Sequence, residues 1–149
     1  VRLVLGAKVD KLHGPPVEVT GIVKKITDGK YVRKGPMHTG VVDNMGRTAV
    51  VDCDGIEIVL TEFRLQPSDL ELYRSVGIEP SKKKILVVKS SVHYRAVHTA
   101  IAKKIIEVDT PGVTSPRLAG YPYKRLRRPI FPLDIETFDI VERKTFDEP

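Results

Sequence analysis

The stretch that most constrains the fold is a run of four apolar residues, Ile85-Leu86-Val87-Val88, followed at once by a dense group of polar side chains. Apolar, mostly β-branched runs of this length are typical of a strand that is buried on both faces. Residues 94–104 then have helical character, and Ile105–Val108 has the composition of another strand. Strand, helix and strand in this order predict a right-handed parallel crossover, so we expect a small βαβ unit here.

The polar group at the end of the first strand is the predicted functional site, and it consists of Lys89, Ser90, Ser91, His93 and Arg95. Ligands bind at the carboxyl ends of strands in open α/β sheets, and backbone N–H groups at a helix start favour an anion. Lys89 and Arg95 are therefore a candidate clamp for a carboxylate or a phosphate. The alternative is that both cations form salt bridges within the fold.

The serines and the histidine of this group each have two interpretations. Ser90 or Ser91 with His93 suggests a nucleophile and its base, but a spacing of two or three residues on a turn is poor geometry for the activating hydrogen bond. Helix capping is the simpler role for the serines. Two roles remain for His93. It either donates to a substrate carbonyl or carboxylate, or it is a hydrogen-bonded core residue.

The first half of the chain predicts antiparallel β structure. Val17–Val23 alternates in part, and Thr27-Asp28-Gly29-Lys30 is a strong hairpin signal, with Tyr31-Val32 starting the return strand. A second hairpin is expected from residues 46–52 and 56–61 around Asp54-Gly55. A short helix should begin near Ser68-Asp69 and end at Gly77. We therefore expect an α+β fold, with an antiparallel β-rich part packed on the small βαβ unit.

The last part of the chain predicts a proline-rich extended arm. Six of the eleven prolines lie at or after Pro111. Residues 121–132 alternate between aromatic, basic and apolar side chains, a mixture that nucleic-acid binders share. The interspersed prolines and apolar residues fit an arm that docks on protein better, so nucleic acid is kept only as the alternative.

Composition limits the classes of function. No apolar run reaches the roughly 20 residues that a membrane-spanning helix needs, so we expect no membrane partner. The single Cys53 cannot form an internal disulfide and fits a reducing compartment, from which we expect a cytoplasmic location. Residues 81–130 carry twelve Lys or Arg against two Asp or Glu, a basic excess that suits an anionic ligand, a nucleic acid or an acidic partner domain. The strand pattern that begins at Val1 fits a piece of a longer polypeptide at least as well as a processed free-standing protein.

The sequence does not predict a complete metal site in this chain. A zinc site needs three or four converging ligands, and neither an HExxH nor a CxxC motif is present. The histidines His93 and His98 are five residues apart, so an ordinary helix would not place them on one face.

Four motifs in order resemble the C-terminal domain of the MlrC-type metallopeptidases, a family named for a microcystin-degrading enzyme. They are Gly14-Pro15-Pro16-Val17-Glu18, Met45-Gly46-Arg47-Thr48-Ala49-Val50, Lys89-Ser90-Ser91-Val92-His93-Tyr94-Arg95-Ala96 and Arg127-Arg128-Pro129-Ile130-Phe131-Pro132-Leu133-Asp134. The similarity covers roughly residues 5–134, and residues 135–149 fall outside it. We therefore expect one domain over residues 1–134 and a tail over residues 135–149.

The resemblance implies a larger zinc-dependent peptidase or amidohydrolase whose zinc is bound by an N-terminal domain of the same polypeptide. This chain would then form the second wall of an interdomain cleft and be inactive by itself. Lys89, Ser90, Ser91 and Arg95 would bind a peptide or amide substrate, and His93 would stabilise an oxyanion or the substrate. The alternative is a non-enzymatic binding module for an anionic partner such as a nucleic acid.

Overall fold

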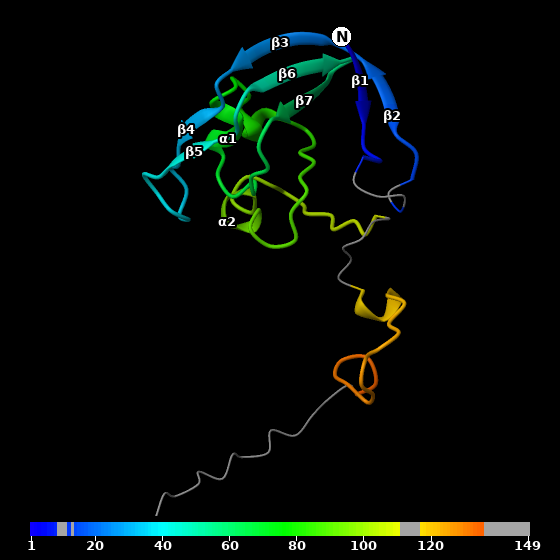
Figure 1. Cartoon of the computed structure of the whole chain (residues 1–149). Helices are drawn as coiled ribbons and strands as arrows, with labels where there is room; N and C mark the ends of the chain where they lie inside the picture. Colours follow the sequence, from blue (N-terminus) through cyan, green and yellow to red (C-terminus); the bar gives the residue numbers. More distant parts are fainter. Residues whose placement is uncertain (9–11, 13, 111–116, 136–149) are drawn as a thin grey trace, which may run out of the picture. The chain divides into compact units, whose positions relative to one another are not determined.

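The first seven elements of the computed structural model are antiparallel strands, as the turn signals of this half predict. They form three sheets, with strand orders β1-β2, β3-β6-β7 and β4-β5 (Figure 1). Their bounds are β1 Arg2–Leu5, β2 Val17–Thr20, β3 Ile22–Thr27, β4 Lys30–Val32, β5 Val42–Asn44, β6 Thr48–Cys53 and β7 Ile56–Thr61.

The predicted hairpin around Asp54-Gly55 is confirmed. β6 and β7 pair from Thr48 opposite Thr61 to Cys53 opposite Ile56. Asp54 and Gly55 have φ values of 54° and 84°, the left-handed conformation that a tight two-residue hairpin needs. The Gly55 N–H donates to Asp52 Oδ1 at 2.9 Å, which closes the turn.

The predicted hairpin at Asp28-Gly29 is wrong. β3 and β4 do not pair with each other, because β3 pairs with β6 and β4 pairs with β5. Asp28-Gly29 instead forms a corner, where the Gly29 carbonyl accepts the Met45 N–H at 2.9 Å. The chain reverses direction only in the loop of residues 33–41. β3 and β4 therefore form one side of a long two-stranded ribbon, β5 and β6 form the other, and the ribbon bends at Asp28-Gly29. Met45 is fully buried inside the bend.

The core lies under this corner and includes a short helix. α1 spans Glu71–Arg74, and the turn after it ends at Gly77, which has a φ of 87° as expected for a helix C-cap. Asp69 Oδ1 accepts the Glu71 N–H at 2.9 Å, so the predicted helix start near this residue is confirmed. The core residues are Tyr31, Met45, Val50, Tyr73, Val76 and Ile78, with Val59, Leu65, Leu70, Leu72 and Val88 packed against them.

The expected βαβ unit is not confirmed in the described part of the chain. Ile85–Val88 belongs to none of the sheets there, residues 94–104 contain only the helix α2 of Arg95–His98, and Ile105–Val108 forms no strand. No second layer from the described residues covers the apolar run, and Ile85 and Val87 are 80% and 91% exposed. α2 ends after one turn, where Thr99 and Ala100 are exposed and provide no packing surface for a longer helix.

The shortness of α2 also removes one argument for an anion site. A helix of a single turn sums too few peptide dipoles to attract an anion strongly at its start. Any role of the Lys89–Arg95 group must therefore come from its side chains and not from a helix N-terminus.

The structure describes residues 1–8, 12, 14–110 and 117–135, and it contains two compact units that divide between residues 108 and 109. The first unit also contains the 3-10 helix η1 of Pro80–Lys82. The described part of the second contains turns and the 3-10 helix η2 of Leu118–Gly120, so a mostly extended arm is not confirmed. Apart from Ile135, the expected tail of residues 135–149 lies outside the described residues. The mostly antiparallel sheets with few helices agree with an α+β class.

Candidate functional site

The turn between the extended segment and α2 is closed by Ser90. Its hydroxyl donates to Gln66 Oε1 at 3.2 Å and accepts the Tyr94 N–H at 3.3 Å. Ser90 is half-buried, and it connects the turn to the loop that precedes α1. Ser90 therefore closes the turn before α2, and its hydroxyl has no hydrogen bond to His93 in the described part of the chain that could activate it as a nucleophile.

Three side chains of the predicted group lie on the surface of this turn. Lys89, Ser91 and His93 are all exposed. Their side chains have no hydrogen bond or ion pair to any residue in the described part of the chain. The fold does not use these polar groups to hold itself together, which leaves them available to a ligand.

Arg95 is exposed but already has a partner. Its guanidinium pairs with Glu107 and lies over the Tyr94 ring, 5.3 Å from the ring centroid. The Tyr94 hydroxyl donates to the same Glu107 carboxylate at 3.2 Å. A substrate carboxylate at Arg95 would therefore have to share the guanidinium with Glu107 or displace it.

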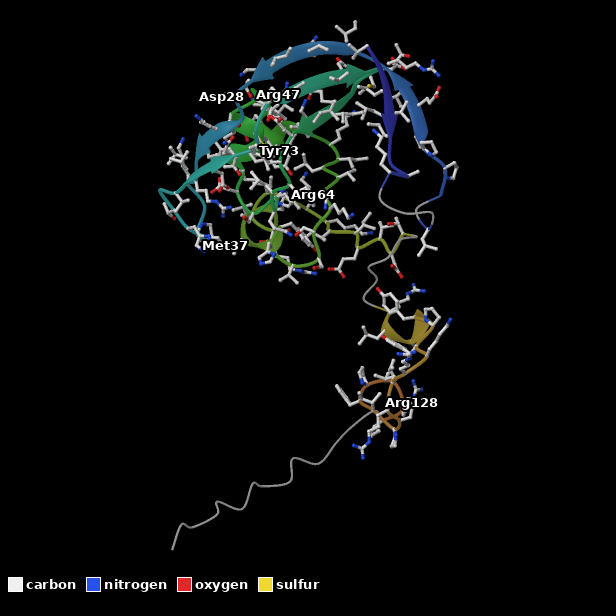
Figure 2. The ribbon with its side chains drawn as sticks, in the orientation of Figure 1. Asp28, Met37, Arg47, Arg64, Tyr73 and Arg128 are labelled. Atoms are coloured by element: carbon white, nitrogen blue, oxygen red, sulfur yellow. The ribbon has the colours of Figure 1, made fainter. Side chains whose placement is uncertain are left out.

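A buried histidine holds α2 against α1. His98 is 5% exposed, its Nδ1 lies 2.9 Å from the Tyr94 carbonyl oxygen, and its Nε2 lies 2.9 Å from the Tyr73 hydroxyl. Because a carbonyl can only accept, Nδ1 donates its hydrogen to Tyr94, and Nε2 shares a hydrogen bond with the Tyr73 hydroxyl. Burial raises the pKa of Tyr73 to about 12, so its hydroxyl keeps the proton it donates. Figure 2 labels Tyr73 in the interior of the first unit.

Sequence reasoning considered His98 only as a metal ligand and missed it as this anchor. The usable signal was its spacing from Tyr94, because residues four apart share one helix face. In the structure Tyr94, Val97 and His98 are the buried residues at this turn, while His93 faces solvent.

A second buried polar network holds the loop of residues 33–41 beside α2. Asp69 is 1% exposed, and its Oδ2 accepts the N–H groups of Lys34 at 2.9 Å and Gly35 at 2.7 Å. A Cβ added at Gly35 would lie 2.8 Å from Val97 Cγ1, so the loop backbone packs directly on α2. Asp69 thus fixes the loop against the helix that follows the polar turn.

The same loop is held at its base by an ion pair. The side chains of Arg33 and Asp43 are 11% and 12% exposed, with Arg33 Nε 2.6 Å from Asp43 Oδ2. The Tyr31 hydroxyl donates to that oxygen at 2.8 Å, and Arg33 also donates to Ser68 Oγ at 3.1 Å. Burial and the bond to the Asp43 carboxylate raise the pKa of Tyr31.

The described residues contain no group of three or more His, Cys, Asp or Glu that could hold a metal ion. His93 is exposed, His98 is buried and bonded to Tyr73, and Cys53 is buried in β6. His38 lies exposed in the loop of residues 33–41, and His13 lies outside the described residues.

Two shallow hollows lie elsewhere and do not include the polar turn. One of about 250 Å³ lies in the second unit. The other, of about 370 Å³, lies on the sheet of β3, β6 and β7, and the residues that line it include Ile26, Ala49, Leu60, Arg47 and Glu62. The residues that line these two hollows include none from Lys89 to Arg95.

The basic motif of the second unit closes on itself. Arg128 pairs with Asp134, and the Asp134 Oδ2 accepts the Ile130 N–H at 2.8 Å. The Arg-Arg-Pro-Ile-Phe-Pro-Leu-Asp motif is thus held in its conformation by bonds between its own first and last parts. Lys124, Arg125 and Arg127 are exposed (Figure 2 labels Arg128 nearby).

No helix in the described ranges is long and apolar enough to cross a bilayer. The family model described as MlrC C-terminus matches residues 1–125. This match includes the Lys89–Ala96 motif and ends before the Arg127–Asp134 motif.

Two known proteins are similar to most of the chain. Microcystinase C from Sphingomonas sp. is 26% identical over 134 residues, which are 87% of this chain and 24% of that protein. A crystal structure described as a "Putative metallopeptidase" from Mesorhizobium sp. BNC1 aligns with a TM-score of 0.73 and 28% identity, over 93% of this chain and 28% of that one. The chain thus spans about a quarter of the length of these relatives. The match over residues 1–125 and both similarities lead to one conclusion: this chain belongs to the MlrC C-terminus family.

Proposed function

We propose that this chain is the C-terminal, substrate-binding part of a metal-dependent peptidase or amidohydrolase and forms one wall of an interdomain active-site cleft. The family membership and the metallopeptidase description of a relative support the class of enzyme. The observation that carries the site is the set of exposed side chains Lys89, Ser91 and His93, which have no bonding partner within the described chain. A polar group that the fold does not need for its own stability is a natural candidate for binding.

The metal, which we expect to be zinc, belongs to a different part of the polypeptide in this proposal. The described residues do not fit a metal ion, since no three potential ligands converge among them. We therefore derive no step through a metal and consider only what this chain's own side chains can do.

His93 would donate a hydrogen bond to the carbonyl oxygen of the scissile amide. Negative charge grows on that oxygen as the bond is attacked, so a positioned donor stabilises the transition state more than the substrate. Lys89 would attract the substrate carboxylate, and the Ser91 hydroxyl would bond to a polar substrate group. Water exclusion on closure of the cleft would strengthen each of these interactions.

Ser90 and Arg95 would act less directly. Ser90 holds the turn through Gln66 and Tyr94 and so positions its neighbours. Arg95 retains several N–H groups beyond those that face Glu107, and a guanidinium can bind two carboxylates at once. We therefore keep Arg95 as a substrate-binding residue whose affinity depends on Glu107.

The test uses the full-length polypeptide that carries this chain, with release of free amino groups from a panel of dipeptides as the assay. His93→Ala should lower kcat/KM by about 100- to 1,000-fold, the usual effect of losing one oxyanion donor. Metal content and melting temperature should stay at wild-type values. The matched control is His38→Asn, which removes an exposed histidine at a φ of 57°, a conformation that asparagine tolerates. A double variant of His93→Ala and Arg95→Ala with wild-type kcat/KM would refute the site.

One observation favours the alternative of an anion-binding module. Residues 81–130 carry twelve Lys or Arg against two Asp or Glu, and Lys84, Lys89, Lys103 and Lys104 are all exposed. A labelled single-stranded oligonucleotide would then bind with an affinity that falls steeply between 50 and 200 mM salt. Absence of measurable binding at 50 mM salt would remove this alternative.

A further inference from the structure

Residues 84–91 lie outside the helices and strands, and their backbone has no hydrogen bonds in the described part of the chain. None of their N–H or C=O groups pairs with another backbone or side-chain group there. Each strand of the first unit is paired with another strand, and the segment joins none of their sheets. Unpaired backbone groups in an extended conformation are what an added strand binds.

The side chains of this segment alternate as they do in a strand. Leu86 and Val88 are half-buried, and Val88 packs against the core. Ile85 and Val87 lie on the opposite side and are 80% and 91% exposed. Two β-branched apolar side chains left in water on an extended backbone are unfavourable unless another layer covers them.

We propose that residues 84–91 are a strand that pairs with a strand from the part of the polypeptide outside these 149 residues, and that this pairing buries Ile85 and Val87. This inference rests on the proposed function, in which a second domain faces the polar turn. It names where the two domains meet and which residues carry the contact.

The choice of partner follows from the comparisons and from the position of the segment. The chain covers 24% of one relative and 28% of the other, so most of each relative lies outside the matched region. The segment runs directly into Lys89 and His93, so whatever covers Val87 also borders the candidate site. The exposed Lys84 and Lys89 flank the apolar residues, which favours a partner strand with an apolar centre and acidic side chains at its ends.

Pairing would also hold the side chains of this surface turn in the fixed positions that catalysis requires. Ser90 holds one side of the turn through Gln66, but the segment before it has no backbone bond to hold it. A partner strand would fix residues 85–89 and thereby the position of Lys89. The segment that the sequence predicts to be a strand buried on both faces would then be one in the complete protein.

Hydrogen exchange in the full-length polypeptide tests the pairing without reference to activity. A strand paired along one edge protects every second amide, so either Ile85, Val87 and Lys89 or Leu86, Val88 and Ser90 should exchange at least 100-fold more slowly than unstructured peptide. The β6 amides serve as the protected reference, and the exposed Thr39, whose N–H has no hydrogen bond among the described residues, serves as the loop reference. Exchange of residues 85–90 at the unstructured rate would overturn the inference.

Substitutions then identify the covering partner. Val87→Asp should abolish at least nine-tenths of the protection at residues 85–90, whereas Val87→Thr, which keeps the β-branched shape, should retain most of it. Protection that disappears on dilution would assign the pairing to a second copy and would overturn the proposed partner. Protected amides together with a fully active His93→Ala variant would leave this interface standing and refute only the proposed function.

Discussion

The Tyr73 hydroxyl lies 2.9 Å from Nε2 of His98, and this bond joins α1 to α2 inside the first unit. The two rings meet edge to face, with centroids 5.7 Å apart. Through Nδ1 the same histidine binds the Tyr94 carbonyl, so one buried ring connects the core to the turn that carries His93. The turn that carries the exposed polar group is therefore connected to the core through the two hydrogen bonds of this buried ring.

The first prediction concerns this bond. Tyr73→Phe keeps the ring but removes the donor, which leaves Nε2 of a buried histidine without a partner. The expected loss is about 1–3 kcal/mol in the free energy of unfolding, measured by urea denaturation with circular dichroism. Tyr94→Phe is the control, because its hydroxyl bonds to the exposed Glu107 and water can replace it. An equal loss in both variants would contradict the role assigned to Tyr73.

The second prediction concerns the buried carboxylate of Asp69. Asp69→Asn keeps only one acceptor oxygen, so its amide N–H would face either the N–H of Glu71 or the N–H groups of Lys34 and Gly35. Losing at least one of these bonds, together with the charge of the acceptor, should cost about 1.5–3 kcal/mol of unfolding free energy. Asp54→Asn is the matched control, since Asp54 is exposed at a φ of 54° that asparagine also adopts. An unchanged urea midpoint for Asp69→Asn would show that the loop does not depend on this carboxylate.

The third prediction concerns the corner of the ribbon. Gly29 has a φ of 71°, and an added Cβ would overlap the Gly46 carbonyl oxygen and lie 2.6 Å from Thr48 Oγ1. Gly55 has a similar φ of 84°, but an added Cβ there meets nothing within 4 Å. Gly55→Ala should therefore lower the free energy of unfolding by about 1–2 kcal/mol, which is the cost of an alanine in the left-handed conformation. Gly29→Ala should lower the free energy of unfolding by clearly more, or prevent folding. Thermal unfolding of the two variants measures this difference.

The fourth prediction concerns pH. Arg74 and Ser81 hold the pKa of Glu79 at about 2, below its ordinary value of 4.5, mainly through the hydrogen bond from Arg74. A carboxyl whose pKa is lower in the folded state contributes stability above its ordinary pKa, and this contribution is lost as the pH falls from 4.5 toward 2. In Arg74→Gln the pKa of Glu79 should rise toward 4.5, measured by NMR titration of the side-chain carboxyl carbon. A value that stays near 2 in that variant would contradict the assigned cause.

Several local features were predictable because neighbouring residues decide them. Asp54-Gly55 forms its hairpin since the two residues accept a positive φ and the flanking strands can pair at once. Gly77 ends the turn after α1 for the same conformational reason, and Asp69 accepts the Glu71 N–H where α1 begins. The Lys89–Ala96 motif identified the family correctly, and the family model covers it.

Other features depend on residues far apart in the chain. Asp28-Gly29 has the same turn signal as Asp54-Gly55. It forms a corner and not a hairpin because β3 pairs with β6 and β4 pairs with β5. The apolar run of residues 85–88 predicts a buried strand, but its partner layer is absent from the described chain, so Val87 is exposed. The contact with Tyr73 of α1, which is distant in the sequence, decides that His98 is buried, whereas His93 is exposed.

The sequence by itself therefore determined the hairpin at Asp54-Gly55, the turns near Asp69 and Gly77 on either side of α1, and the family, and it predicts a site from Lys89 to Arg95. Only the tertiary structure decided which strands pair, that Ser90 and Arg95 are bonded within the fold, and that Lys89, Ser91 and His93 face solvent. The physical reason is that backbone conformation at a turn depends on adjacent residues, whereas burial and pairing depend on the surfaces that distant segments bring together.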